Sequence, residues 1–167
     1  MTPAQRKRLA MLNTSDLERV LLLMEPTEKG TSLEGPTSAA RALEPMLLAH
    51  EREHMAALFL DRRNRVISAE IMTIGSHEFT IMDPRYILRR ALHVNASGLI
   101  LGHNHPSGAP TPSQDDIRVT ERMISACKAV GIPLIDHIVI GGPGCFASMA
   151  DRGLIGAHTP YPAVVGA

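Results

Sequence analysis

Two histidines and an aspartate near the middle of the chain have the types and the spacing of a metal site. His103 and His105 are separated by one residue, and Asp116 follows after ten more. Imidazole nitrogens and a carboxylate suit Zn²⁺, and three protein ligands leave one coordination position for water. Sites with such an open position are usually catalytic, whereas structural zinc sites are closed by four protein ligands. The spacing therefore predicts a zinc site that can do chemistry.

The neighbouring residues predict how these side chains come together. The apolar run 99–101 lies between glycine residues and is typical of a buried strand over 97–103. Because side chains alternate along a strand, both histidines would leave from one face. Pro106 would end the strand, a loop rich in proline and glycine follows, and Ser113 is a typical helix N-cap. We expect Asp116 in the first helical turn, close to the end of the strand.

The same residues resemble the motif of a known family. His-Asn-His-Pro-Ser-Gly over 103–108, with Pro-Ser and Asp116 after it, is similar to the JAMM motif of JAB/MPN metalloprotease-like domains, in the form typical of bacterial RadC proteins. The resemblance extends over about residues 50–155. It implies an α/β fold, in which helices flank a mixed sheet in a cytidine-deaminase-like three-layer arrangement. It also implies that the two histidines and the aspartate bind Zn²⁺.

Hydrolysis by an activated water also requires a general base, which takes the proton and passes it to the leaving group. The resemblance implies a glutamate just before the first core strand, and Glu53 occupies this place ahead of the apolar segment 54–60. Glu51 is two residues away and would share the face of Glu53 in an extended segment. We favour Glu53, and Glu51 stays open as the alternative.

Ser113 has two candidate roles. As the N-cap, its side-chain oxygen would satisfy a free backbone N–H, which is worth about 1 kcal/mol. In the JAMM pattern, the serine three residues before the aspartate donates a hydrogen bond to the developing oxyanion. Such a donor is typically worth about 10²–10³ in rate. We expect one hydroxyl to serve only one of these roles at a time, and we favour the catalytic role.

Other residues with reactive side chains are expected to be structural or solvated. His137 follows Asp136 at the start of an apolar strand, and we expect it to be a core residue, since a fourth protein ligand would close the site. Cys127 falls on the apolar side of its helix. The arginines within 62–65 and 85–90 indicate solvated faces, and they are the first place to look for an acidic partner.

Composition favours one soluble domain. The 167 residues are 44% hydrophobic and 20% charged, which is enough to bury one sizeable core. The 17 basic and 17 acidic residues cancel, so the strongly basic footprint of many nucleic-acid-binding domains is not seen. No apolar run approaches the about 20 residues that span a bilayer. The two cysteines provide no disulfide framework, which favours a reducing cytoplasm.

The chain is expected to divide into an N-terminal segment and linker over 1–36, a JAB/MPN domain over 37–155 and a C-terminal tail over 156–167. The pattern predicts helices over 15–25, 37–52, 83–94 and 113–130. It predicts strands over 55–60, 65–73, 97–103, 134–140 and 146–149. RadC-like proteins carry a helix-hairpin-helix region that contacts DNA, and we expect residues 1–45 to be too short for it.

Two functions from different classes follow from these observations. The leading hypothesis is a zinc-dependent metallohydrolase of the JAMM type, which cleaves a peptide or isopeptide amide bond of a protein substrate through a metal-activated water. The alternative is a RadC-like accessory protein of DNA repair or DNA metabolism, whose metal domain binds partners or nucleic acid without proteolysis. No membrane partner is expected, and the sequence specifies no oligomeric state.

Overall fold

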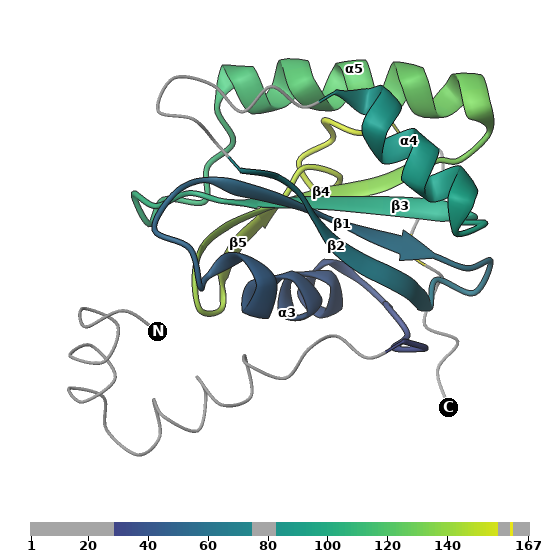
Figure 1. The fold of residues 1–167 in the computed structure, drawn as a ribbon. Coiled ribbons are helices and arrows are strands. Elements are labelled where there is room, and N and C mark those ends of the chain that lie inside the picture. The colour runs from purple at the N-terminus through teal and green to yellow at the C-terminus, as the bar shows by residue number, and fades with distance from the viewer. Residues whose placement is uncertain (1–28, 75–82, 157–160, 162–167) are drawn as a thin grey trace.

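The described residues form a mixed five-stranded sheet with helices on both faces (Figure 1). The structure is a computed structural model that describes residues 29–74, 83–156 and 161. Helix α3 (Pro36–Leu47) covers one face of the sheet, and helices α4 (Pro84–His93) and α5 (Gln114–Val130) cover the other. This arrangement confirms the predicted α/β fold with its three layers. The helix predicted over 15–25 lies outside the described residues.

The strands run in the order β2-β1-β3-β4-β5. Their bounds are β1 His54–Leu60, β2 Val66–Ile74, β3 Gly98–Asn104, β4 Leu134–Gly142 and β5 Cys145–Ser148. In this sheet β3 and β4 pair in parallel, and the other neighbouring strands pair antiparallel. Because α5 joins the parallel pair, β3, α5 and β4 form a βαβ unit. The carboxyl ends of parallel strands in such units are where ligands typically bind.

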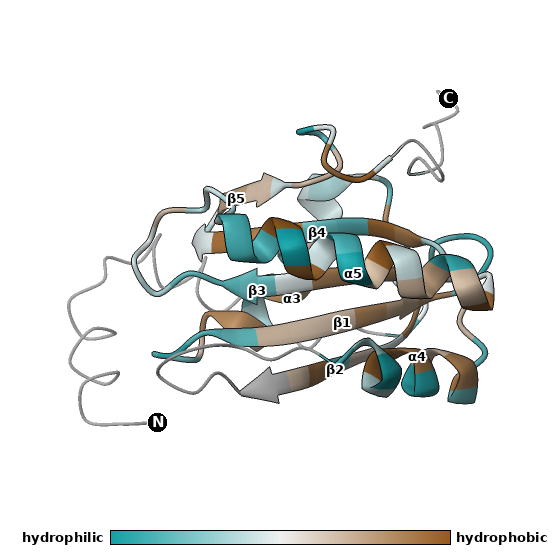
Figure 2. Cartoon of the chain, turned by 90° about the horizontal axis from the view of Figure 1, so that it is seen from above, coloured by the Kyte–Doolittle hydropathy of each residue, from teal (hydrophilic) through white to brown (hydrophobic). Residues whose placement is uncertain are grey.

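The central strands are buried on both faces because helices cover both. All seven residues of β1 and all seven of β3 are buried. Side chains alternate, so Phe59 and Leu101 pack with residues of α4 and α5, whereas Leu58 and Ile100 pack with residues of α3. In Figure 2, strand β1 is coloured mostly as hydrophobic and is seen between α5 and α4. No helix among the described residues is long and apolar enough to cross a membrane.

The prediction of a helix over 37–52 is wrong at its end, since α3 stops at Leu47. Pro45 lies in the last turn of α3, and proline supplies no N–H to the helical ladder. The N–H of Leu48 still donates to the carbonyl of Glu44 at 2.9 Å, and the chain then leaves the helix. The segment 48–53, just before β1, is therefore not helical.

Residues of the segment 1–36, which was predicted to be an N-terminal segment and linker, pack against the domain. The N–H of Gly30 donates to the carbonyl of Val66 at 2.8 Å, and Leu33 is fully buried among residues of α3 and β1. In the predicted C-terminal tail, the hydroxyl of Tyr161 donates to the buried Asp136 at 3.0 Å. The remaining elements that the structure describes lie within two residues of their predicted bounds.

Candidate metal centre

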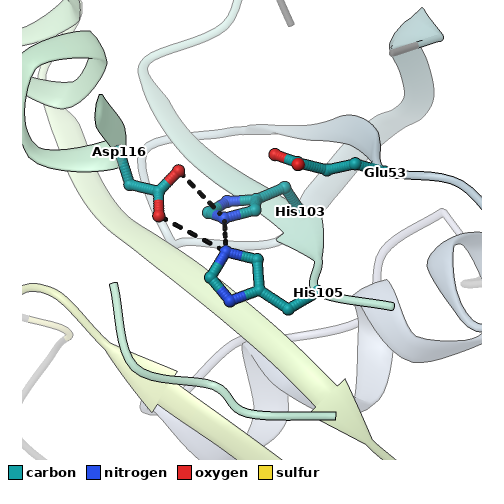
Figure 3. Close-up of side chains that lie close together, drawn as sticks. All are labelled: Glu53, His103, His105 and Asp116. Atoms are coloured by element: carbon teal, nitrogen blue, oxygen red, sulfur yellow. Dashed lines mark hydrogen bonds and ion pairs between the residues drawn. The ribbon is translucent and has the colours of Figure 1, made fainter. Parts of the chain in front are cut away.

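Glu53, His103, His105 and Asp116 converge at the carboxyl end of β3 (Figure 3). One potential ligand atom from each of them lies within 4.8 Å of the others. His103 belongs to β3 and His105 follows it, Asp116 lies in the first turn of α5, and Glu53 directly precedes β1. The βαβ connection thus brings Asp116 to the histidines, and the antiparallel pairing of β1 with β3 brings Glu53. In Figure 2, β3 turns hydrophilic towards this end.

The two histidines and the aspartate form a close triangle. The two Nε2 atoms are 2.9 Å apart, Asp116 Oδ1 is 3.2 Å from His103 Nε2, and Asp116 Oδ2 is 3.3 Å from His105 Nε2. Zinc binds nitrogen and oxygen ligands at about 2.0–2.2 Å, so the ligand atoms of a tetrahedral site are about 3.3–3.6 Å apart. The separations found are at or slightly below these values. The residues present therefore fit a zinc ion.

The hydrogen bond of His105 leaves an acceptor atom facing this triangle. His105 Nδ1 lies 2.8 Å from the carbonyl oxygen of Ala109. A carbonyl oxygen only accepts, so Nδ1 carries a hydrogen, and in a neutral ring the lone pair is left on Nε2. This lone pair points at the carboxylate of Asp116, which is itself an acceptor. Nitrogen and oxygen acceptors that converge in this way are typical of a cation site.

The electrostatics of the triangle favour a positive charge within it. Burial alone would raise the pKa of the Asp116 carboxyl, but His103 and His105 donate hydrogen bonds to it when their Nε2 atoms carry a hydrogen, and these bonds hold that pKa well below its usual range. The backbone N–H and the hydroxyl of Ser113 also donate to Asp116 Oδ2, each at 2.7 Å. In turn, the hydrogen bond with Asp116 raises the pKa of His105. Asp116 is therefore ionised at neutral pH and attracts a proton or a metal ion.

The structure brings Glu53 to the cluster and leaves Glu51 outside it. Glu53 is partly buried, and in Figure 3 its carboxylate points towards the histidines. Glu51 is exposed and does not belong to the groups that converge. The sequence alone left both open because they share a face in an extended segment.

Asn104 holds the segment that carries Glu53. It lies between the two histidines, so its buried side chain leaves from the opposite face of β3. Asn104 Oδ1 accepts from the N–H of His54 at 2.8 Å, and Asn104 Nδ2 donates to the carbonyl of Arg52 at 3.0 Å. These bonds fix the backbone on both sides of Glu53, and therefore the point from which its side chain extends to the cluster.

Ser113 is the N-cap of α5. Its Oγ accepts from the N–H of Asp116 at 3.1 Å and donates to Asp116 Oδ2 at 2.7 Å. Capping uses a lone pair and donation uses the hydrogen, so the expectation that one hydroxyl serves only one role is wrong. The group that competes with oxyanion donation is the carboxylate of Asp116. Ser113 is an exposed residue, and the hydrogen bond from its hydroxyl to Asp116 is partly buried.

Two glycines let the loop between β3 and α5 lie close to β4. Gly108 has a φ of 85°, which favours glycine. A Cβ at Gly141 would lie 2.4 Å from the carbonyl oxygen of Gly108, so this approach requires glycine in β4. The same loop supplies the Ala109 carbonyl that orients His105. The packing of the loop on β4 therefore helps to place a potential ligand.

His137 lies behind the cluster, as a hydrogen-bonded core residue. Its Nε2 is 2.8 Å from His103 Nδ1, and its Nδ1 is 2.7 Å from Thr120 Oγ1. Burial lowers the pKa of His137 well below its usual value, so the ring is neutral. Sequence reasoning missed Thr120. Its place four residues after Asp116, on the same face of the helix, is the signal that could have found it.

The fold and the cluster define a JAB-type domain with a candidate metal site. The family model of the RadC-like JAB domain matches residues 33–154, and the chain belongs to this family. The chain is 44% identical over 133 residues to a UPF0758 protein of Vibrio vulnificus. It is also 41% identical over 156 residues to a UPF0758 protein of Vibrio parahaemolyticus, and 43% identical over 133 residues to one of Xanthomonas campestris. The resemblance to RadC proteins in the motif is thus confirmed.

These relatives are longer than the chain. The match covers 80% of this chain and 59% of the Vibrio vulnificus protein, and 90% of this chain and 69% of the Vibrio parahaemolyticus protein. The names of the relatives state no activity, metal or substrate. The reaction and the partners of the whole protein are therefore proposals.

Proposed function

We propose that this chain is a zinc-dependent hydrolase of the JAMM type that cleaves a peptide or isopeptide amide bond. The proposal rests on the convergence of Glu53 with His103, His105 and Asp116 in a RadC-like JAB domain. The two imidazoles and the Asp116 carboxylate would hold Zn²⁺ with a coordination position left open. When bound, zinc supplies Lewis acidity, which lowers the pKa of a water molecule and polarises a carbonyl group.

Glu53 is the general base in this proposal. Its carboxylate would take a proton from the attacking water and deliver it to the leaving amine nitrogen. The hydrogen bonds of Asn104 would hold the carboxylate in place for both transfers. The hydroxyl hydrogen of Ser113 would turn from Asp116 Oδ2 to the carbonyl oxygen of the scissile bond, where negative charge develops.

The test compares Glu53→Gln with the matched variant Glu51→Gln. Glutamine keeps the size of the side chain but accepts no proton at neutral pH. After zinc loading, metal content is measured by mass spectrometry, and kcat is measured on peptide and isopeptide substrates. We expect Glu53→Gln to keep zinc and to lose about 10²–10⁴ in kcat, and Glu51→Gln to match wild type. Equal losses in both variants, or no loss in Glu53→Gln, would contradict this assignment.

The alternative function, an accessory role in DNA metabolism, is tested with the same material. A zinc-loaded wild type that cleaves no peptide or isopeptide substrate, but shifts duplex or single-stranded DNA at moderate salt, would favour this alternative. The formal net charge is zero, so such binding would depend on local groups such as Arg85 and Arg89 of α4.

A cytoplasmic location is part of the proposal. Cys127 and Cys145 are both free thiols in the structure. Free thiols are typical of proteins in a reducing compartment.

A further inference from the structure

A buried series of hydrogen bonds connects His103 with Asp116, two of the proposed metal ligands, on the side of His103 away from the candidate metal centre. It runs from His103 Nδ1 to His137 Nε2 at 2.8 Å and from His137 Nδ1 to Thr120 Oγ1 at 2.7 Å. It ends at the backbone carbonyl oxygen of Asp116, 2.7 Å from Thr120 Oγ1. His103 and His137 are 0% exposed and Thr120 is 1% exposed, so bulk water cannot replace any of these partners.

The carbonyl of Asp116 determines which atom donates and which accepts in each of these hydrogen bonds. A carbonyl oxygen only accepts, so the hydroxyl of Thr120 donates its one hydrogen to it. The Thr120 oxygen then accepts from His137, whose Nδ1 must carry a hydrogen. A neutral imidazole has one N–H, so His137 Nε2 is an acceptor and His103 Nδ1 must donate to it. The lone pair of a neutral His103 is left on Nε2, the atom that faces Asp116 and His105.

The reverse assignment of donors and acceptors would leave two acceptors facing each other at the Asp116 carbonyl. If Thr120 donated to His137, the lone pairs of its oxygen would face the Asp116 carbonyl oxygen at 2.7 Å. Two acceptors that face each other in a buried place are costly. Met149 Sδ lies 3.4 Å from Thr120 Oγ1, but a thioether is only a weak acceptor and does not compete with a carbonyl.

We propose that Thr120 and His137 are positioning residues that set the metal affinity of the centre, because they fix the ring orientation and the tautomer of His103. The inference rests on the zinc site of the proposed function, and it does not require that hydrolysis occurs. A histidine ligand with its second nitrogen held by a partner is already in the binding form, and loss of such partners typically weakens metal binding. The bonds of His137 to His103 and to Thr120 also link β3 to α5 through β4, which helps to keep two ligands at a constant spacing.

The decisive variant is Thr120→Val, with Thr120→Ser as its matched control. Valine keeps the size and removes the hydroxyl, whereas serine keeps the hydroxyl. The zinc dissociation constant of the 167-residue chain is measured by competition with a chromophoric chelator at one pH, and folding is checked by circular dichroism. We expect Thr120→Val to weaken zinc binding about 10–100-fold, and Thr120→Ser to stay within about threefold of wild type. Wild-type affinity in folded Thr120→Val would overturn the proposal.

A second measurement uses the wild type and needs no variant to fold. Nuclear magnetic resonance of the isotopically labelled, zinc-loaded chain reports which ring nitrogens carry hydrogen. We expect His137 to carry its hydrogen on Nδ1, and a hydrogen on His137 Nε2 would overturn the proposal. Neither measurement involves a substrate. A chain that binds zinc but cleaves no amide would contradict the proposed function and leave this inference intact.

Discussion

At the scale of single residues, three consecutive positions divide two tasks between the two faces of one strand. His103 and His105 face the candidate metal centre, and Asn104 faces the backbone around Glu53. An amide suits this place because it must accept from an N–H and donate to a carbonyl at the same time. Neither a carboxylate nor an alkyl side chain can do both.

Asn104→Asp is expected to lower hydrolysis and to leave zinc binding unchanged. The aspartate still accepts from the N–H of His54, but its second oxygen faces the carbonyl of Arg52, so the segment that carries Glu53 shifts. A displacement of about 1 Å in a catalytic group can cost about 10²-fold in rate. The measurement is kcat, with zinc content determined on the same sample. Asn95→Asp at an exposed position is the control, and zinc loss in Asn104→Asp alone would contradict this explanation.

The candidate ligands of the centre could be predicted from the sequence, but it could not be predicted which ring nitrogens carry a hydrogen. The chemistry of a zinc site restricts the ligand types, and the spacing of His103, His105 and Asp116 restricts their geometry. The partner of His103 is different, because His137 is 34 positions away along the chain. The two rings meet only through the parallel register of β3 and β4, which no local sequence pattern specifies.

At the scale of elements, the loop between β3 and α5 depends on its contact with β4. A Cβ at Gly141 would lie 2.4 Å from the carbonyl oxygen of Gly108, whereas a Cβ at Gly142 would lie 4.0 Å from the Cβ of Cys145, which is ordinary van der Waals contact. The backbone oxygen cannot rotate away as a side chain can. The loop must therefore move if position 141 carries a side chain.

Gly141→Ala is expected to lower the free energy of unfolding by about 1–3 kcal/mol, which is the usual cost of overpacking. It should also weaken zinc binding, because the displaced loop carries the Ala109 carbonyl that orients His105. Gly142→Ala is the matched control and should stay within about 0.5 kcal/mol of wild type. Urea unfolding and chelator competition measure the two effects. If Gly141→Ala and Gly142→Ala behave alike, the loop does not depend on this contact.

Most element bounds could be predicted because local signals mark them. Asp83 caps α4 and Pro84 is its first residue, and Ser113 caps α5. The end of α3 could not be predicted in this way. Pro45 is tolerated in its last turn, and the helix stops two residues later because the chain must extend into the central strand β1. That requirement comes from the sheet and not from helix propensity.

At the scale of the whole molecule, the core between the sheet and α5 predicts different reactivity for the two cysteines. Cys127 is 2% exposed, and burial raises the pKa of its thiol to about 11. Cys145 is exposed. The thiolate is the reactive form, and at pH values well below 11 the Cys127 thiol stays protonated.

Alkylation of the folded chain at about pH 8, near the ordinary thiol pKa, is therefore expected to modify Cys145 and to spare Cys127. Denaturant should make both thiols react. Peptide mapping by mass spectrometry distinguishes the two sites. Equal modification rates in the folded chain would mean that α5 does not cover the sheet as described.

The alternation of side chains along β3 has a consequence for engineering. Insertion or deletion of one residue before His103 would turn the imidazoles towards α3 and the amide towards the centre, since each shift by one place exchanges the two faces. β1 and β4 pair with β3 on its two sides and leave no freedom to absorb such a change. A designer who wishes to transplant this chemistry into another scaffold must therefore move the three strands together with α5, which carries Asp116.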